Sequence, residues 1–205
     1  MQILVTGGLG YIGSHTTVEL LHKGFDVVIV DDLSNSKLNV FDKIKKITGK
    51  NPKLEIIDLK NKSEVKKLFT NCSFDGIIHF AAHKSVNESV NFPEKYFNNN
   101  IGGLENLLEN IDKEMYFIFS SSCTVYGQAD RMPITENLPI KKSESPYGET
   151  KQICEGILKK FSEANPLFNN ITLRYFNPIG AHKSGMIGEL PLGKPENLVP
   201  FLTQT

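Results

Sequence analysis

The stretch Val5-Thr-Gly-Gly-Leu-Gly-Tyr-Ile-Gly-Ser-His15 joins an apolar segment, residues 2–6, to an amphipathic segment, residues 12–23. The glycines within it form a GxxGxxG pattern, made by Gly7, Gly10 and Gly13. Glycines in such a turn permit positive φ angles, let backbone N–H groups approach a pyrophosphate and allow the helix to pack close to the strand. The pyrophosphate then lies at the positive end of the helix. A strand, a glycine-rich turn and a helix in this order therefore predict a dinucleotide-binding fold.

The rest of the chain continues this alternation of strand and helix. Strands are predicted at residues 2–6, 27–30, 54–58, 76–80, 116–120 and 171–176, and helices at residues 12–23, 37–47, 64–71, 96–110 and 147–165. The strands are nearly continuous in Val, Ile, Leu and Phe, as expected of parallel strands buried on both faces. Alternating elements with right-handed crossovers indicate an α/β fold with a doubly wound, Rossmann-like parallel sheet. Residues 1–176 would form this dinucleotide-binding domain.

An acidic pair, Asp31-Asp32, ends the second predicted strand, 18 residues after Gly13. An acid at this point accepts hydrogen bonds from a ribose 2′-hydroxyl, and two carboxylates repel a 2′-phosphate. NAD is therefore favoured over NADP. Asp58 and the small residues of Phe80-Ala-Ala-His-Lys84 end the next two strands and fit the same cofactor. Asp58 equally fits a turn or helix cap, and His83 fits an ordinary surface or hydrogen-bonded histidine better than a catalytic one.

A phenol and an ammonium, Tyr147 and Lys151, lie four residues apart and hence on one face of a predicted helix. Ser120-Ser-Ser122 follows the fifth strand, at the sheet edge where open α/β folds bind ligands. A tyrosine with a pKa near 10 is a poor base at neutral pH. A nearby ammonium and a positively charged nicotinamide lower that pKa. With Ser122 holding the substrate hydroxyl, the set predicts proton removal from an alcohol as hydride leaves its carbon.

The composition argues against several other classes of protein. Lys plus Arg, 23 residues, balance Asp plus Glu, 23 residues, which argues against a basic nucleic-acid surface. No apolar run reaches the roughly 18 residues of a membrane helix, and the N-terminus does not resemble a signal peptide. Three scattered cysteines fit a reducing compartment, and no ligand spacing indicates a metal site. We therefore expect a soluble cytoplasmic domain with no nucleic-acid or membrane partner.

Several longer stretches are similar to a known enzyme family. They are residues 5–15, Asp31-Asp-Leu-Ser-Asn-Ser36, Ile78-His-Phe-Ala-Ala82 with Lys84, Phe97-Asn-Asn-Asn100, Phe119-Ser-Ser-Ser-Cys-Thr-Val-Tyr-Gly127, Ser145-Pro-Tyr-Gly148 and Leu173-Arg-Tyr-Phe-Asn-Pro-Ile-Gly-Ala-His182. Together they resemble the UDP-sugar 4-epimerases of the extended short-chain dehydrogenase/reductase family. The resemblance covers nearly the whole chain.

The resemblance implies an NAD site and a UDP-sugar site. NAD would be contacted by Tyr11, Ile12, Asp31, Asp32, Leu33, Ser34, Asn35, Ser36, Asp58, Leu59, Phe80, Ala81, Ala82, His83, Lys84, Asn99, Tyr147, Lys151 and Phe176. The UDP-sugar would be contacted by Ser122, Thr124, Asn177, Asn197 and Leu198. Tyr147 would take the proton of the sugar 4-hydroxyl while hydride passes from C4 to NAD, and hydride would return to the other face of the turned 4-keto sugar. UDP-glucose and UDP-galactose would thus be interconverted.

The last residues, 177–205, are rich in Gly and Pro and are interpreted as the beginning of a UDP-sugar-binding lobe. Because members of the family continue through a longer lobe, we expect the chain to be a fragment or a shortened product. In the alternative interpretation, the chain is a fragment that binds NAD but has little enzymatic activity. Epimerases of this kind are often homodimers, which makes a homodimer possible here.

Related chemistries remain as alternatives. Sugar-nucleotide 4,6-dehydratases carry an Asp-Glu pair after the serines, where this chain has Cys123-Thr124, which cannot act as acid and base. Decarboxylases of UDP-glucuronate and epimerases of N-acetylated sugars share the fold and the cofactor. A dinucleotide-binding module without catalysis is the alternative from a different class, and the presence of Ser122, Tyr147 and Lys151 argues against it.

Overall fold

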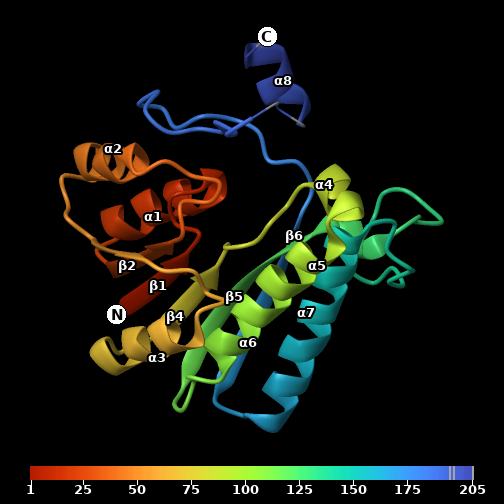
Figure 1. Ribbon diagram of the computed structural model, residues 1–205, viewed down its shortest axis with the longest axis horizontal. Coiled ribbons are helices and arrows are strands. Elements are labelled where there is room, and N and C mark those ends of the chain that lie inside the picture. The colour runs from red at the N-terminus through yellow and green to blue at the C-terminus, as the bar shows by residue number, and fades with distance from the viewer. Residues whose placement is uncertain (194, 196, 205) are drawn as a thin grey trace.

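Figure 1 shows the computed structural model, which describes residues 1–193, 195 and 197–204. A six-stranded sheet has the order β3-β2-β1-β4-β5-β6, and all neighbouring strands are parallel. The strands are β1 (Gln2–Thr6), β2 (Asp26–Asp31), β3 (Lys53–Ile56), β4 (Gly76–His79), β5 (Met115–Ser122) and β6 (Phe168–Tyr175). The chain winds outward from β1 to β3 and then crosses to β4, so its direction reverses between β1 and β4. This confirms the doubly wound, Rossmann-like fold, whose ligands bind at the carboxyl ends of the strands near that reversal.

The helices lie on both faces of the sheet (Figure 1). They are α1 (Tyr11–His22), α2 (Asn39–Thr48), α3 (Lys62–Asn71), α4 (Val86–Asn91), α5 (Pro93–Tyr96), α6 (Gly102–Leu108), α7 (Pro146–Ala164) and α8 (Leu198–Gln204), with a π-helical turn at Phe97–Ile101 and a 3-10 turn at Cys123–Tyr126. The single helix predicted over residues 96–110 is helical up to Leu108, but the π turn interrupts it between α5 and α6. The sequence did not predict α4 and the 3-10 turn, which are too short to carry a periodic pattern.

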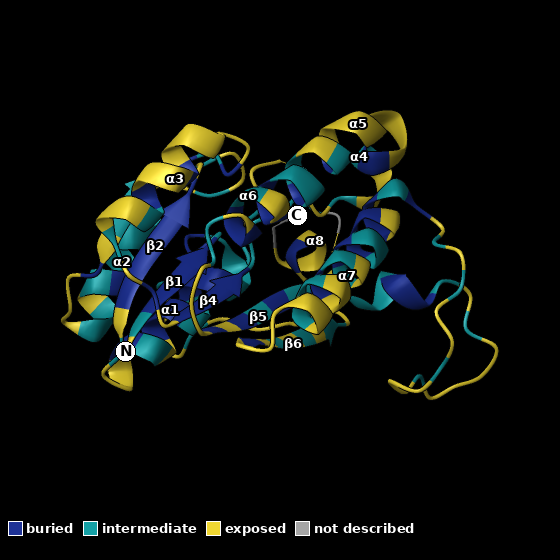
Figure 2. Cartoon of the chain, turned by 90° about the horizontal axis from the view of Figure 1, so that it is seen from below, coloured by how far each residue is buried: buried dark blue, intermediate teal, exposed yellow. Residues whose placement is uncertain are grey.

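Two apolar clusters show why the strands are hydrophobic throughout. Alternate residues of β1 point to opposite faces: Ile3 and Val5 pack with α1 and α2, whereas Leu4 packs with α3, α6 and α7. This is the two-residue period of a strand. Figure 2 shows buried strands, among them β1, β2 and β4, next to helices whose outer faces are exposed. Both faces are covered over β1, β2 and β4, whereas β5 and β6 leave Tyr116, Ile171 and Leu173 exposed.

Two helix starts that matter for the site follow from local sequence. Asn61 caps α3 by accepting a hydrogen bond from the Glu64 N–H at 3.3 Å. Ser145 caps α7 by accepting one from the Gly148 N–H at 3.1 Å, and Pro146 occupies the first helical position. The cap of α7 thus fixes the position of Tyr147 in the first turn of the helix. The third strand ends at Ile56 rather than at the predicted residue 58, so Asp58 lies in the turn that follows it.

Candidate active site and dinucleotide cleft

A cleft of about 350 Å³ opens at the carboxyl edge of the sheet. It brings together nearly all of the predicted site residues: Gly7, Gly10, Tyr11, Ile12, Gly13, Asp31, Asp32, Ser34, Asn35, Ser36, Asp58, Leu59, Phe80, Ala81, Ala82, His83, Lys84, Asn99, Ser122, Thr124, Tyr147, Lys151, Phe176, Asn177 and Asn197. Two predicted residues do not line it. Leu33 adopts a positive φ of 61° and donates its N–H to the Asp31 carboxylate, and Leu198 begins α8 with 71% of its surface exposed.

The glycine turn forms a cradle that side chains would fill. Gly7 has a φ of +65°, and a Cβ there would lie 2.7 Å from the Ala81 nitrogen, at the end of β4. A Cβ on Gly13 would collide with the Gly7 carbonyl oxygen. Gly10 caps α1 without a side chain, and the first turn of the helix carries no acidic residue. The turn therefore presents backbone N–H groups and a positive helix end, which fit a pyrophosphate.

Asp31 connects the glycine turn to the loop after β2. Its side chain is buried, with 6% of the residue exposed. The carboxylate accepts hydrogen bonds from the Leu9 N–H at 3.0 Å, the Leu33 N–H at 3.0 Å and the Ser36 hydroxyl at 2.7 Å. A carboxylate offers about four acceptor positions. Asp31 therefore keeps one position for a ribose hydroxyl while it fixes the shape of the turn.

The other two acids at this end of the cleft make local contacts. Asp32 accepts hydrogen bonds from the N–H and the hydroxyl of Ser34, at 2.9 and 2.6 Å. Asp58 accepts the Lys60 N–H at 2.9 Å and pairs with the Lys60 ammonium at 3.3 Å. Asp58 is thus a turn residue that also lines the cleft, which joins the two interpretations that the sequence left open.

Asn100, which the sequence analysis did not single out, holds the loop after β4. Its side-chain oxygen accepts the His83 N–H at 2.8 Å, and its nitrogen donates to the His83 carbonyl at 3.1 Å and to the Thr150 hydroxyl at 3.0 Å. Asn100 is 2% exposed and lies in the π-helical turn, a distortion often found at functional sites. It ties the cofactor loop to α7. Burial, with the charge of Lys95 as the next cause, lowers the pKa of His83, so this histidine is neutral at pH 7.

The predicted reactive set comes together from β5 and α7. Ser122 is the last residue of β5, and its hydroxyl accepts the Thr124 N–H at 3.2 Å. The Lys151 ammonium donates to the Ser120 carbonyl at 2.8 Å and lies 5.9 Å from the centre of the Tyr147 ring. Burial lowers the pKa of Lys151 to about 8. This lysine is therefore held inside the protein and changes charge close to physiological pH.

The structure corrects one expectation about Tyr147. We expected the neighbouring ammonium to lower the pKa of the phenol. Burial is instead the largest cause and raises that pKa above its usual value, and the hydrogen bond with Ser122 offsets this only in part. The phenol is thus protonated at pH 7 in this chain. A phenolate, once formed, would be stabilised by the nearby Lys151 ammonium and by the positive charge of a bound nicotinamide.

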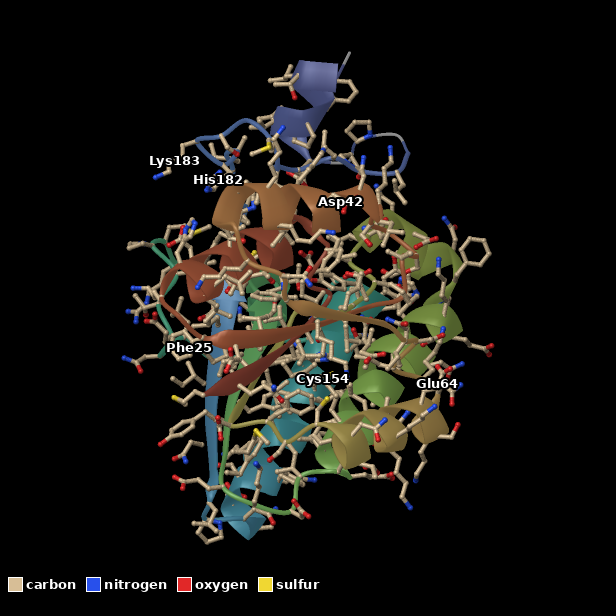
Figure 3. All side chains as sticks on the ribbon, turned by 90° about the vertical axis from the view of Figure 1, so that its left-hand side faces the viewer. Phe25, Asp42, Glu64, Cys154, His182 and Lys183 are labelled. Carbon is tan, nitrogen blue, oxygen red and sulfur yellow. The ribbon has the colours of Figure 1, made fainter. Side chains whose placement is uncertain are left out.

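The segment after β6 passes over the glycine turn. The Tyr11 hydroxyl donates to the Gly180 carbonyl at 2.7 Å, and Figure 3 shows His182 and Lys183 on this segment beside α1 and α2. Glu189 accepts from the Lys84 ammonium at 3.2 Å and from the Asn197 amide at 2.5 Å. Glu189 was not predicted, because its partner Lys84 is 105 residues away.

Comparison with known proteins identifies the family. The model of the GDP-mannose 4,6 dehydratase family matches residues 4–191. The chain belongs to this family. Within it, the chain is 48% identical to UDP-glucose 4-epimerase of Dictyostelium discoideum over all of its own length and 60% of that protein, and 48% identical to that of Yersinia enterocolitica, again over its own whole length and 61% of the relative.

Solved structures agree with this. The crystal structure of UDP-glucose 4-epimerase from Bifidobacterium longum, in complex with NAD+ and UDP, superposes with a TM-score of 0.95 at 41% identity, over all of this chain and 62% of that one. The enzyme from Stenotrophomonas maltophila, with NAD and formylated UDP-arabinopyranose, gives a TM-score of 0.93 at 43% identity and 61% coverage of that chain. The resemblance seen in the motifs is confirmed. The chain spans about 60% of the length of the relatives it matches.

Two searches of the described residues found nothing. None of their helices has the length and hydropathy to span a membrane. Nor does that part of the chain contain a group of three or more His, Cys, Asp or Glu side chains that could hold a metal ion.

Proposed function

We propose that this chain carries the cofactor site and the reactive groups of an NAD-dependent enzyme that interconverts UDP-glucose and UDP-galactose by transient oxidation at C4. The observation that carries the proposal is that Ser122, Tyr147 and Lys151 line the same cleft as the glycine turn. A hydroxyl, a phenol and an ammonium thus lie where a nicotinamide bound by that turn would end. The similarity to UDP-glucose 4-epimerases solved with NAD supports the assignment.

The cleft fits NAD at two points. Gly7 and Gly13 leave no room for a Cβ, so the turn packs tightly against the chain after β4 and against itself, and its backbone N–H groups at the start of α1 can approach a pyrophosphate. The Asp31 carboxylate keeps an acceptor position for a ribose hydroxyl, and Asp32 beside it repels a 2′-phosphate. When bound, NAD supplies the acceptor and later the donor of the C4 hydride.

Each reactive side chain has a distinct task in this proposal. Tyr147, as a phenolate, takes the proton of the sugar 4-hydroxyl and becomes a phenol, which later returns a proton. Ser122 holds that hydroxyl and stabilises the phenolate before the proton moves. Lys151, fixed on the Ser120 carbonyl, supplies positive charge to the phenolate and to the cofactor ribose. A general base placed in this way typically contributes 10²–10⁴-fold to a rate.

Residues 177–205 are proposed to contribute to the UDP-sugar site. Asn177, Asn197 and Thr124 line the cleft, and the Thr124 hydroxyl oxygen is buried with no hydrogen-bond partner. A buried hydroxyl without a partner costs about 1–3 kcal/mol, and a sugar hydroxyl would satisfy that of Thr124 only after the side chain turns toward the cleft. Leu198 would contact the nucleotide from the start of α8.

The family's own description names a dehydratase, and the site argues against that chemistry here. Elimination of water requires an acid and a base next to the reactive tyrosine. The corresponding positions are Cys123 and Thr124, and burial raises the pKa of the Cys123 thiol. A neutral thiol and a hydroxyl cannot replace two carboxyl groups in proton transfer, so epimerisation is favoured.

The test is a discontinuous assay of the purified 205-residue chain with UDP-galactose and no added NAD. The reaction is quenched and the UDP-sugars are separated by chromatography, while NAD released from a denatured sample is counted per chain. Tyr147→Phe removes the phenol, and Tyr116→Phe, on an exposed tyrosine of β5, is the matched control. We expect UDP-glucose from the chain and from the control, and about 10²–10⁴-fold less from Tyr147→Phe.

Three results would overturn the proposal. Retained NAD without turnover would limit this chain to cofactor binding, and an absence of NAD would remove the cofactor assignment as well. Equal turnover by Tyr147→Phe would assign the base to another group.

The same reasoning extends to the cell. We propose a role in galactose metabolism in the cytoplasm, supported by the expected sugar substrate and the scattered cysteines. A homodimer and the lack of a nucleic-acid partner stay predictions from the sequence, and sedimentation of the purified chain measures the first of them.

A further inference from the structure

Glu155 is the centre of a polar network directly behind the reactive residues. Its carboxylate binds both Nε and Nη2 of Arg174 on β6, at 3.0 and 2.7 Å, and accepts the Ser121 hydroxyl of β5 at 2.6 Å. Its side chain is only 12% exposed. Arg174 in turn lies 4.8 Å from the centre of the Tyr126 ring, at the end of the 3-10 turn. A two-pronged pair of this kind has a fixed geometry.

The residues of this network are close in the chain to the reactive groups, either as direct neighbours or one helical turn away. Ser121 precedes Ser122 and follows Ser120, whose carbonyl holds the Lys151 ammonium. Glu155 lies four residues after Lys151 on α7, hence on the same face. Ser121 pairs with Arg174 in the β5–β6 register, so the network connects both strands to α7 at the point where β5 reaches the cleft.

Glu155 also adds negative charge near Lys151, although burial is the larger influence and lowers the pKa of Lys151. The titratable groups near the Lys151 ammonium are Tyr147, Cys154 and Glu155 on α7 and His79 on β4, while β5 contributes the Phe119 ring. Burial raises the pKa of Cys154 to about 11 and lowers that of His79 to about 3, so both are neutral at pH 7. Figure 3 shows Cys154 inside the molecule. Of these four groups, only the Glu155 carboxylate, paired with Arg174, carries a charge.

We propose that Glu155 is a positioning residue for the reactive set: anchored by Arg174, it holds the end of β5 in place through the Ser121 hydroxyl and adds negative charge one helical turn from Lys151. The proposal rests on the proposed function for its effect on turnover. Its electrostatic part concerns the folded chain alone and can be measured without substrate.

Glu155→Gln keeps the shape of the side chain and removes its charge. We expect kcat to fall about ten- to 100-fold at unchanged KM, because small displacements of reactive groups have effects of this size. Loss of the charge destabilises the ammonium, so Lys151 loses its proton at a lower pH and the alkaline limb of the kcat profile moves to lower pH. Glu109→Gln, which breaks an exposed ion pair with Lys62, is the matched control and leaves both quantities unchanged.

Arg174→Gln is expected to shift the alkaline limb in the opposite direction. It also serves as a second variant if Glu155→Gln folds poorly. It leaves the Glu155 charge uncompensated, so Lys151 holds its proton more tightly and the alkaline limb moves to higher pH. Ser121→Ala removes only the hydroxyl. We expect a smaller decrease in kcat than in Glu155→Gln, and no shift of the alkaline limb of the pH profile. A general loss of stability cannot produce shifts in opposite directions.

The Lys151 titration is also read directly, from the ¹³Cε NMR signals of lysine-labelled protein, with the Lys151 signal assigned through Lys151→Met. This measurement needs no turnover. If the unmodified chain is inactive, the proposed function fails, and the titration still decides the role of Glu155. An unchanged Lys151 titration in Glu155→Gln, or lower thermal stability with unchanged kcat and pH profile, would overturn the proposal.

Discussion

Two parts of the cleft, the glycine turn after β1 and the segment after β6, are held in different ways. The turn is fixed by a backbone contact, in which the Gly7 N–H donates to the Val30 carbonyl at 2.7 Å, and by the buried Asp31 carboxylate, which accepts the Leu9 N–H. The segment after β6 is held by side chains such as Glu189 and the buried Ile187, and it also carries exposed apolar residues, with Leu190 57% exposed. We therefore expect the grip on the cofactor to belong to the sheet edge, and the proposed contacts to the sugar nucleotide to depend on the segment after β6.

Gly13→Ala is the most direct test of the expectation that the glycine turn holds the cofactor. A Cβ at this position meets the Gly7 carbonyl, which is backbone and cannot move aside without deforming the cradle. We expect loss of bound NAD and a decrease in the free energy of unfolding of roughly 2 kcal/mol or more. NAD content per chain and thermal melting measure the two effects.

The matched control is Gly156→Ala, in the middle of α7, where an added Cβ meets nothing within 4 Å. In a helix, alanine is more favourable than glycine by about 1 kcal/mol. This variant should therefore be more stable than the unmodified chain and keep its NAD. Equal NAD retention by both variants would contradict the cradle.

Lys151→Met is expected to have the next largest effect, on turnover and not on the fold of the turn. Without the ammonium the phenolate loses its compensating charge, and kcat should fall about 10²–10⁴-fold. In the unmodified chain Lys151 has a pKa of about 8, below its ordinary value. The ammonium is therefore present below that pH, and kcat should fall as the pH rises through it. A profile that stays flat from pH 7 to about 9 would contradict this role.

These predictions separate what local sequence reveals from what it cannot. Gly7, Gly13, Asp31, Tyr147 and Lys151 were predicted because each lies in a short pattern whose spacing expresses a turn or a helix face. Asn100, Glu155 and Glu189 act through residues that the fold brings close from 17 to 105 positions away. The upward shift of the Tyr147 pKa could not be predicted from the sequence either, because burial of the phenol depends on the packing of α7 against β5.

Asn100→Ala tests one of these long-range contacts on the cofactor side of the cleft. The variant leaves the N–H and carbonyl of His83 without their partner, and buried groups left in this way cost about 1–3 kcal/mol each. We expect roughly 2 kcal/mol lower stability and partial loss of NAD, measured by melting and NAD content. Asn91→Ala, on an exposed asparagine of α4, is the control. Unchanged NAD content would show that the loop after β4 holds its shape by itself.

Glu189→Gln should have the smallest effect of these variants. It tests the segment after β6, as Gly13→Ala tests the glycine turn. The amide can still accept from Asn197, but the charge attraction to Lys84 is lost, and a partly exposed ion pair of this kind contributes about 0.2–1 kcal/mol. We expect KM for UDP-galactose to rise about two- to fivefold, with kcat and NAD content unchanged, and Glu94→Gln on α5 to do nothing. A loss of NAD would instead mean that the segment after β6 holds the cofactor as firmly as the glycine turn does. The sugar contacts and the cofactor grip would then be one unit, since the same ion pair would control both.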